Sequence, residues 1–404
     1  MSIIVQKYGG SSVADTEKLI KISKLIAGVK EQGHDVVVVV SAMGKTTNQL
    51  IEMAKSLSVN PEKRELDMLL STGERITMAL LCIALNDLGI KAISLTGSQS
   101  GIITNDRYND AKVIEVRPFR VQDELARGKV VVIGGFQGVS YKRDITTLGR
   151  GGSDTSAVAL AAALNAVRCE IYSDIDGVYT TDPNIFKDAR HLPEISYQQI
   201  QEMAEAGAKV LCAQAIQFAK EAKIAIYARS TFNPGRETII REMSPSDKPG
   251  VIAVVHENDI ARIVFNSTNL KDMQNENFLE LLNFLETNDI PLKELNLVDS
   301  EEHNLLKASF IISKKNAHNW GKIEKQLLEK FKNTIDINHS FGAISLIGEG
   351  FSRDNRVVSE TISILQKNKI IYWGLTTTSF RVSILINKEL LETGIAILHN
   401  YWIH

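Results

Sequence analysis

The chain has 404 residues, of which 44% are apolar, enough for two or three domains with large buried cores. Its formal net charge of −2 argues against nucleic acid as the main partner. The apolar runs 36–40 and 157–164 are too short to cross a bilayer, and no signal-peptide pattern precedes the first strand. We therefore expect a cytoplasmic protein without membrane contact. Three widely spaced cysteines are predicted to be buried thiols rather than disulfides or zinc ligands: Cys82, Cys169 and Cys212.

The amino-terminal segment predicts a strand, a glycine turn and a helix. Residues 3–8 form the strand, which leads into Lys7-Tyr8-Gly9-Gly10-Ser11-Ser12. Apolar residues at helical spacing follow, namely Leu19, Ile22, Ile26 and Val29. The free N–H groups at a helix start attract an anion, so this turn is a candidate anion site with a lysine at the strand end. A second buried strand at 35–40 ends in Ser41-Ala42-Met43-Gly44.

The helical stretch from residue 62 to residue 88 is interrupted by Ser71-Thr72-Gly73-Glu74. The most informative segment comes later, where Gly149-Arg150-Gly151-Gly152-Ser153-Asp154 precedes an alanine-rich helix. Its glycines let the backbone approach a ligand, and Arg150 offers a planar fork for a carboxylate or phosphate. A carboxylate such as Asp154 is not expected in a site that binds only phosphate, because both groups are negatively charged. Asp154 suits a ligand that also carries a positive charge, such as an amino acid or a metal. An ordinary glycine-rich turn with an exposed charge pair is the alternative.

Two standard nucleotide motifs fail in this chain. Gly44-Lys45-Thr46 resembles the end of a Walker A loop, but position 39 is valine where glycine is required. Asp154 stands where the dinucleotide fingerprint requires its third glycine. The sequence therefore predicts neither a P-loop protein nor a Rossmann dehydrogenase.

The element pattern changes near residue 244. Strands and helices alternate up to residue 242, which predicts a mainly parallel sheet covered on both faces. A Ser/Pro-rich linker follows at 244–250. The remainder repeats a β-α-β-β-α order twice, over 260–331 and 343–401, and predicts two ferredoxin-like units. The second unit is one strand short, and residues 251–256 are expected to supply the missing strand.

Five segments, in this order, make the chain resemble the aspartokinase family. They are Lys7-Tyr8-Gly9-Gly10-Ser11-Ser12-Val13, Ser71-Thr72-Gly73-Glu74, Gly149-Arg150-Gly151-Gly152-Ser153-Asp154, Gly177-Val178-Tyr179-Thr180-Thr181-Asp182-Pro183 and Gly207-Ala208-Lys209-Val210-Leu211. The tandem C-terminal units are similar to the paired ACT domains of regulated aspartokinases. The resemblance implies an amino-acid-kinase catalytic domain at 1–243 and a regulatory region at 244–404. Its ACT domains are expected at about 258–338 and 339–404.

The resemblance implies transfer of the ATP γ-phosphate to the side-chain carboxylate of L-aspartate, the entry to lysine, threonine and methionine synthesis. Magnesium is expected with the nucleotide. No general base is needed, because a free aspartate side chain has a pKa of about 3.9 and is already ionised at neutral pH. The reaction instead needs charge neutralisation and in-line positioning.

Residue roles follow from the same resemblance. The expected catalytic residues are Lys7, at the transferring phosphate, together with Arg150 and Asp154. Arg150 is assigned to a substrate carboxylate and Glu74 to the α-ammonium, and Asp154 shares that role or orients Arg150. The expected aspartate pocket comprises Ser41, Thr47, Glu74, Arg150, Gly151, Gly152 and Ser153. The expected nucleotide site comprises Lys7, Gly9, Gly10, Ser11, Ser173, Asp174, Tyr179, Asp182 and Lys209. Direct metal ligands are not assigned.

The chain departs from the family pattern in two regions. Asn184 stands where many members have an arginine that reaches the nucleotide, and Lys187 is the nearest cation after it. Neither C-terminal unit has the Pro-Gly turn at which an amino-acid effector lodges, although Thr376-Thr377-Thr378-Ser379 is retained. We therefore expect weak or atypical feedback by lysine or threonine. The C-terminal units are expected to pair into a homodimer or a higher oligomer.

Two other functions are compatible with parts of the sequence. A kinase for glutamate or a carbamate would use the same fold, since one methylene discriminates by only about 1–3 kcal/mol. A catalytically silent amino-acid sensor would keep the C-terminal units, but the intact Lys7 and Arg150–Asp154 set disfavours it.

Overall fold

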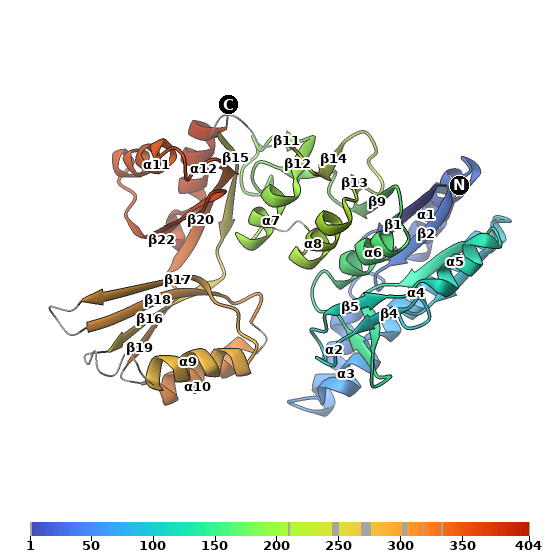
Figure 1. The fold of residues 1–404 in the computed structure, drawn as a ribbon, viewed down its shortest axis with the longest axis horizontal. Coiled ribbons are helices and arrows are strands. Elements are labelled where there is room, and N and C mark those ends of the chain that lie inside the picture. The colour runs from blue at the N-terminus through green and yellow to red at the C-terminus, as the bar shows by residue number, and fades with distance from the viewer. Residues whose placement is uncertain are drawn as a thin grey trace. The chain divides into compact units, whose positions relative to one another are not determined.

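The computed structural model describes residues 2–208, 211–244, 250–267, 276–300, 305–317, 319–332 and 334–403 (Figure 1). The chain divides into two compact units. Unit 1 holds Met1–Tyr179, Arg190–Glu205 and Lys209–Pro245. Unit 2 holds Thr180–Ala189, Ala206–Ala208 and Ser246–His404. The assignment of 1–243 and 244–404 as domains stays a prediction, because two short segments of the first range group with unit 2.

Unit 1 is built on an eight-stranded sheet of order β12-β14-β13-β9-β1-β2-β6-β3. Its strands are β1 (Ile3–Tyr8), β2 (Asp35–Val40), β3 (Ala92–Leu95), β6 (Val130–Gly134), β9 (Arg168–Ser173), β12 (Glu194–Ser196), β13 (Ile226–Ser230) and β14 (Glu237–Arg241). All neighbouring strands are parallel except β13 and β14. The sheet is therefore mainly parallel, as the alternation of strands and helices predicts.

Helices cover both faces of the central strands. On one face, α1 (Thr16–Glu31) and α4 (Thr72–Asp87) pack over alternate residues of β1, β2 and β6. On the other face, α6 (Gly152–Ala163) packs on β1, β2 and β9 and against α8 (Ala213–Ala222). The alternating burial follows from the strand geometry, since successive side chains point to opposite faces.

The other elements of unit 1 lie around this core. The helices are α2 (Thr46–Leu57), α3 (Lys63–Leu70), α5 (Phe119–Ala126) and α7 (Tyr197–Glu205). A small sheet of order β5-β4-β7-β8 comprises β4 (Ile102–Thr104), β5 (Val113–Val116), β7 (Gln137–Ser140) and β8 (Ile145–Thr147). A two-stranded ladder joins β10 (Val178–Tyr179) to β11 (His191–Leu192).

The helical stretch Lys63–Asp87 is long and apolar enough, by length and composition alone, to cross a membrane. Half of its most apolar 18-residue segment is buried inside the protein. The sequence predicts helix here, but the two apolar runs considered as possible membrane spans, 36–40 and 157–164, did not include this stretch. It breaks at Ser71, which separates α3 from α4. Because Met78, Leu81 and Leu85 of α4 belong to the core under the sheet, we interpret α4 as a core helix.

Unit 2 contains two four-stranded antiparallel sheets, each with helices on one face (Figure 1). The first has the order β17-β18-β16-β19, from β16 (Ile260–Ser267), β17 (Lys293–Ser300), β18 (Leu305–Ser313) and β19 (Ile335–Asn338). Helices α9 (Glu276–Thr287) and α10 (Trp320–Lys330) cover it and share its apolar core. This β-α-β-β-α-β connectivity is the expected ferredoxin-like pattern.

The second sheet has the order β15-β20-β22-β21. It comprises β15 (Gly250–Glu257), β20 (Phe341–Glu349), β21 (Tyr372–Thr377) and β22 (Arg381–Asn387), with α11 (Arg356–Lys367), the short 3-10 helix η3 (Lys388–Leu390) and α12 (Leu391–Trp402). The extra strand expected at 251–256 is present, because β15 pairs antiparallel with β20. We call each of these two sheets, together with its helices, a module. In chain order, the first module (β16 to β19) is thus inserted between β15 and the other elements of the second module.

The segment Thr180–Ala189 belongs to unit 2 through contacts with the second module. The Val254 amide donates to the Thr180 carbonyl at 2.7 Å, and the Thr180 hydroxyl lies 2.8 Å from His399 Nε2. The Phe186 and His399 rings lie 4.7 Å apart. A stretch that sequence analysis places in the catalytic domain is therefore fixed by residues far along the chain.

Candidate active site

The turns after β1 and β2 lie at one edge of the main sheet. The two strands are parallel, so their carboxyl ends lie side by side. The Ser41 amide donates to the Tyr8 carbonyl at 3.1 Å, and the Gly44 amide donates to the Gly10 carbonyl at 3.0 Å. A side chain at Gly10 would lie 3.0 Å from the Ala42 carbonyl oxygen, so glycine allows this close approach. The two predicted turns thus form one backbone surface.

The glycine-rich loop before α6 has two left-handed residues, Gly149 with φ of 72° and Gly151 with φ of 69°. A side chain at Gly151 would also lie 2.7 Å from Cys212 Cβ. Helix α6 begins at Gly152, so its free N–H groups and positive dipole end lie directly after Arg150. The loop has the geometry of an anion site with an added guanidinium.

Lys7 and Asp154 form an ion pair at this site, with Nζ and Oδ1 separated by 2.6 Å. The two side chains are only 11% and 13% exposed. Lys7 comes from the end of β1 and Asp154 from the first turn of α6. The Asp154 carboxylate thus has Lys7 as an ion-pair partner, and its expected role, sharing the α-ammonium or orienting Arg150, stays a prediction. A weakly hydrated pair of this kind can exchange partners when a charged ligand enters.

Glu74 is buried in the first turn of α4, with 3% of its surface exposed. Its Oε1 accepts a hydrogen bond from the Ala42 amide at 3.1 Å. Its Oε2 is buried and makes no hydrogen bond within the described residues. Burial raises the pKa of Glu74 to about 7, because the charged form loses hydration. An ammonium group at Oε2 would satisfy this oxygen and stabilise the ionised carboxylate.

The end of β6 connects Glu74 to the start of α6. A side chain at Gly134 would lie 3.3 Å from Glu74 Cβ, and one at Gly135 would lie 2.9 Å from Ser153 Cβ. Ser153 is buried behind Gly135. The structure therefore brings Lys7, Glu74, Ser153 and Asp154 to one place, although they come from three separate elements, β1, α4 and α6. Neither Gly134 nor Gly135 was singled out from sequence; their position at a strand end was the available signal.

Two further residues of the predicted aspartate pocket are half-buried. Ser41 follows β2, and Thr47 lies in the first turn of α2. Ser11, which was predicted for the nucleotide site, is exposed, and its carbonyl accepts from Lys18 Nζ at 2.9 Å.

The predicted nucleotide residues are more dispersed. Ser173 makes local bonds, since its Oγ lies 3.1 Å from both the amide nitrogen and the carbonyl oxygen of Ile175. Tyr179 donates to Asp176 Oδ1 at 2.7 Å, and Asp174 is exposed. These roles are untested by this geometry, and Lys209 lies outside the described residues.

Asp182 belongs to unit 2, whereas the other predicted nucleotide residues belong to unit 1. Its Oδ1 accepts from the Asn184 amide at 2.9 Å and from Asn184 Nδ2 at 3.0 Å. The carboxylate thus closes a local turn, which is the usual behaviour of an aspartate at such a position. Asn184 takes part in the same turn.

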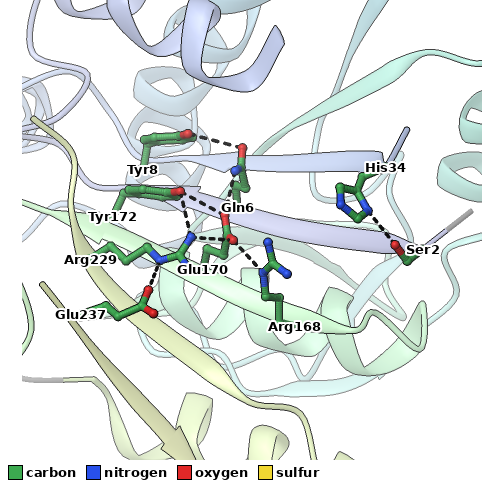
Figure 2. A network of polar contacts seen from close by, with 9 residues as sticks. All are labelled: Ser2, Gln6, Tyr8, His34, Arg168, Glu170, Tyr172, Arg229 and Glu237. Atoms are coloured by element: carbon green, nitrogen blue, oxygen red, sulfur yellow. Dashed lines mark hydrogen bonds and ion pairs between the residues drawn. The ribbon is translucent and has the colours of Figure 1, made fainter. Parts of the chain in front are cut away.

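Figure 2 shows a polar network around Glu170 that was not predicted from the sequence. Gln6 and Glu170 are register partners on β1 and β9, and successive strand side chains alternate between faces, so the network lies on the sheet face opposite Lys7. Glu170 is 1% exposed, accepts from Gln6 Nε2 at 2.8 Å and from the Tyr172 hydroxyl at 3.0 Å, and pairs with two arginines. Arg168 Nε and Arg229 Nη1 each lie 2.7 Å from its Oε1. The network ties β1, β9 and β13 together beside the strand that carries Lys7. The available signal was a glutamate between two apolar residues, Cys169 and Ile171, in a buried strand.

The charge state of Glu170 depends on the residues of this network. Burial raises the pKa of Glu170, but Arg229, Gln6 and Arg168 together hold it below its ordinary value. The neighbouring Tyr8 and Tyr172 rings stack with centroids 4.8 Å apart.

One of the three cysteines is less buried than the sequence predicts. Cys82 and Cys169 are buried free thiols, as expected, but Cys212 is only partly buried. Its Sγ lies 3.0 Å from Thr155 Oγ1, against the Gly151 turn. No cluster of three or more histidine, cysteine, aspartate or glutamate side chains suited to a metal occurs within the described ranges.

Comparison with known proteins matches residues 2–230 to the amino acid kinase family. The chain is 39% identical over 406 residues to an aspartokinase from Bacillus sp. (strain MGA3), covering 99% of this chain and 97% of the relative. It is 38% identical to the aspartokinase of Mycolicibacterium smegmatis, covering 99% and 96%. The chain belongs to the aspartokinase family. It is therefore a kinase, and the family expected from the five sequence segments is confirmed.

Solved aspartokinase structures share the fold. E. coli aspartokinase III in complex with aspartate and ADP (R-state) matches with a TM-score of 0.83 over 100% of both chains, at 22% identity. The aspartate kinase from Synechocystis matches with a TM-score of 0.56 at 30% identity, covering 99% of this chain and 69% of that one. The expected fold class, an α/β kinase fold followed by two ferredoxin-like ACT domains, is confirmed.

Proposed function

We propose that this protein phosphorylates the side-chain carboxylate of L-aspartate with ATP and forms 4-phospho-L-aspartate. The observation that carries the proposal is the buried Glu74 carboxylate, with one oxygen unbonded among the described residues, next to the Lys7–Asp154 pair. An α-amino acid with a second carboxylate complements these charges. The E. coli structure named above contains aspartate and ADP, which supports the same substrates here.

Each charged residue has a distinct role in the proposed reaction. Glu74 binds the α-ammonium of aspartate, and Arg150 binds a carboxylate. Lys7 leaves Asp154 for the transferring phosphate, whose developing charge it stabilises. The aspartate side chain is already ionised at neutral pH, so these residues position and neutralise charge without a general base.

Magnesium is proposed to accompany ATP, since the phosphates carry the charge that it neutralises. Asp154 offers a carboxylate oxygen for it once Lys7 has moved to the phosphate. Backbone N–H groups at the start of α6 fit the phosphate oxygens. The nucleotide roles of Ser173, Asp174, Tyr179 and Lys209 remain proposals, as does the location of the enzyme in the cytoplasm.

Regulation is proposed to involve the two ACT modules. A second E. coli structure contains lysine and aspartate in a T-state, with a TM-score of 0.76 at 22% identity. In this chain the missing Pro-Gly turns favour weak or atypical feedback by lysine or threonine. The edge strands β17 and β21 expose apolar side chains, including Leu297 and Trp373, and we propose that such edges pair in a homodimer or larger oligomer.

A hydroxamate assay with ATP, magnesium and L-aspartate tests the proposed reaction, with L-glutamate as the competing substrate. Arg150→Ala should lower kcat/KM for aspartate by on the order of a hundredfold, since an unpaired bound carboxylate costs about 2–5 kcal/mol. Arg120→Ala, at an exposed position of α5, is the matched control and should leave the rate unchanged. Absence of aspartyl hydroxamate with the wild-type protein would reject the function.

A further inference from the structure

Asp67 is a fully buried carboxylate in α3 that no motif pointed to. Its Oδ1 accepts from the Thr147 hydroxyl at 2.6 Å, and its Oδ2 accepts from the Thr147 amide at 2.9 Å. The Asn109 amide donates to both oxygens at 3.1 Å. One side chain therefore joins three segments that are far apart in sequence. We call these contacts the Asp67 clamp.

The clamp reaches the loop that carries Arg150. Thr147 ends β8 and lies three residues before Arg150, and its carbonyl accepts from the Ala111 amide at 2.9 Å. A side chain at Gly149 would lie 2.7 Å from Asp110 Oδ1, so the segment after Asn109 packs directly on the glycine-rich loop. Displacing Thr147 would thus displace the base of that loop.

The clamp also reaches the turn that carries Glu74. The Ser71 amide donates to the Asp67 carbonyl at 3.0 Å, and Ser71 directly precedes α4. Gln137 Nε2 donates to the Ser71 carbonyl at 3.1 Å and holds the same turn from the small sheet. The segments that carry the proposed ammonium-binding and carboxylate-binding groups are therefore both bonded to Asp67, one at its main-chain carbonyl and the other at its carboxylate.

A buried carboxylate tolerates little movement of its donors. Removing it from water is costly, and only the hydrogen bonds from Thr147 and Asn109 compensate for that cost. Rotation or translation of either segment would lengthen these bonds in a medium where water cannot replace them. The clamp is therefore a stiff spacer between the Glu74 turn and the Arg150 loop.

We propose that the Asp67 clamp fixes the position of Arg150 relative to Glu74 and thereby selects aspartate over glutamate. The inference rests on the proposed function, which assigns these two residues to the substrate. When Arg150 and Glu74 are fixed in position, the space between these two residues and Lys7 fits a substrate side chain of only one length. Glutamate is longer by one methylene, so its reactive carboxylate is out of line with the transferring phosphate. Asp67 and Thr147 are positioning residues that act through Arg150.

The test compares two valine substitutions on β8. Thr147→Val removes the hydroxyl bond to Asp67 and keeps the side-chain shape. Thr146→Val is the matched control, because Thr146 is also fully buried but its hydroxyl lies 2.6 Å from Thr104 Oγ1. Thr147→Ser restores the hydroxyl and should behave as the wild type. Thermal unfolding of each variant shows whether it folds, and Asp67→Asn is a second variant of the same contact.

Thr147→Val should raise KM for aspartate about tenfold, the lower end of the effect of one lost hydrogen bond to a charged group, and leave KM for ATP unchanged. The wild-type preference for aspartate over glutamate, about 10- to 200-fold for one methylene, should fall at least threefold in kcat/KM. In an Arg150→Ala background, Thr147→Val should add little to the loss with aspartate, because both changes remove the same interaction.

The outcomes separate this inference from the proposed function. If the wild-type protein does not phosphorylate aspartate, both are wrong. If it does, and Arg150→Ala impairs it, then equal effects of Thr147→Val and Thr146→Val overturn the clamp alone. Full additivity of Thr147→Val with Arg150→Ala, or an unchanged preference for aspartate over glutamate, also overturns it.

Discussion

Aspartate binding by the wild-type enzyme is expected to depend on pH near neutrality, and replacing Glu74 with glutamine should remove this dependence. Burial raises the pKa of Glu74 from 4.5 to about 7 in the ligand-free protein. Only the ionised carboxylate pairs with an ammonium group. The proton must therefore leave Glu74 before or during aspartate binding, and it is released to the solvent.

The magnitude follows from the raised pKa. With a pKa of about 7, roughly a tenth of the Glu74 side chains are ionised at pH 6 and roughly nine tenths at pH 8. The apparent affinity for aspartate should therefore rise about tenfold between these values, and binding at pH 7 should release about half a proton. Glu74→Gln should bind aspartate weakly at every pH and release no proton.

Stability gives a second readout with a definite sign. The folded protein holds the Glu74 proton over a range in which the unfolded chain has lost it, between pH 4.5 and about 7. The unfolding free energy should therefore fall as pH rises through this range, by roughly 3 kcal/mol from this group, and Glu74→Gln should remove that contribution.

Calorimetric titration of L-aspartate at pH 6, 7 and 8, in two buffers that differ in ionisation enthalpy, measures both the affinity and the proton release. Glu52→Gln, at an exposed position of α2, is the control and should match the wild type. A wild-type affinity that does not change between pH 6 and 8, or a Glu74→Gln variant with the wild-type pH dependence, would refute the reasoning.

Three further substitutions have distinct expected outcomes. Lys7→Ala should lower kcat at least a hundredfold with a small change in KM for aspartate, because its charge acts on the transition state; steady-state kinetics that show normal kcat contradict the role. Gly151→Ala should inactivate the enzyme, since φ of 69° and the nearby Cys212 both exclude a side chain; wild-type activity would show that the loop adapts. Glu170→Gln should lower the unfolding free energy by up to about 3 kcal/mol, measured by denaturant titration at neutral pH, because Arg168 and Arg229 lose their buried partner. The pKa of Glu170 is lowered in the folded state, so the difference in unfolding free energy between wild type and Glu170→Gln should be present above pH 4.5 and disappear as pH falls through that lowered pKa. A difference that does not change with pH would argue against this role of Glu170.

Local sequence determined the elements and the glycine turns. The apolar runs at 3–8 and 35–40 gave the limits of β1 and β2, since strand burial depends on residue alternation and length. The break near Ser71 and a helix next to the glycine-rich segment were also predicted, because turn and helix-start preferences act over a few residues. Helix α6 begins at Gly152, inside that segment, which is earlier than the sequence predicts. The Lys7, Glu74, Arg150 and Asp154 assignments came from such segments through a family resemblance.

Only the tertiary structure decided how these residues meet. Asp154 pairs with Lys7. The pKa of Glu74 is raised because its carboxyl group is buried, and the hydrogen bond from the Ala42 amide, in another segment, opposes this rise only in part. The Asp67 clamp joins residues 80 positions apart, so no local pattern marks it. The physical reason is that burial, the position of Arg150 and the charge state of a carboxylate depend on neighbours that folding brings together, whereas strand and turn preferences are properties of the adjacent chain.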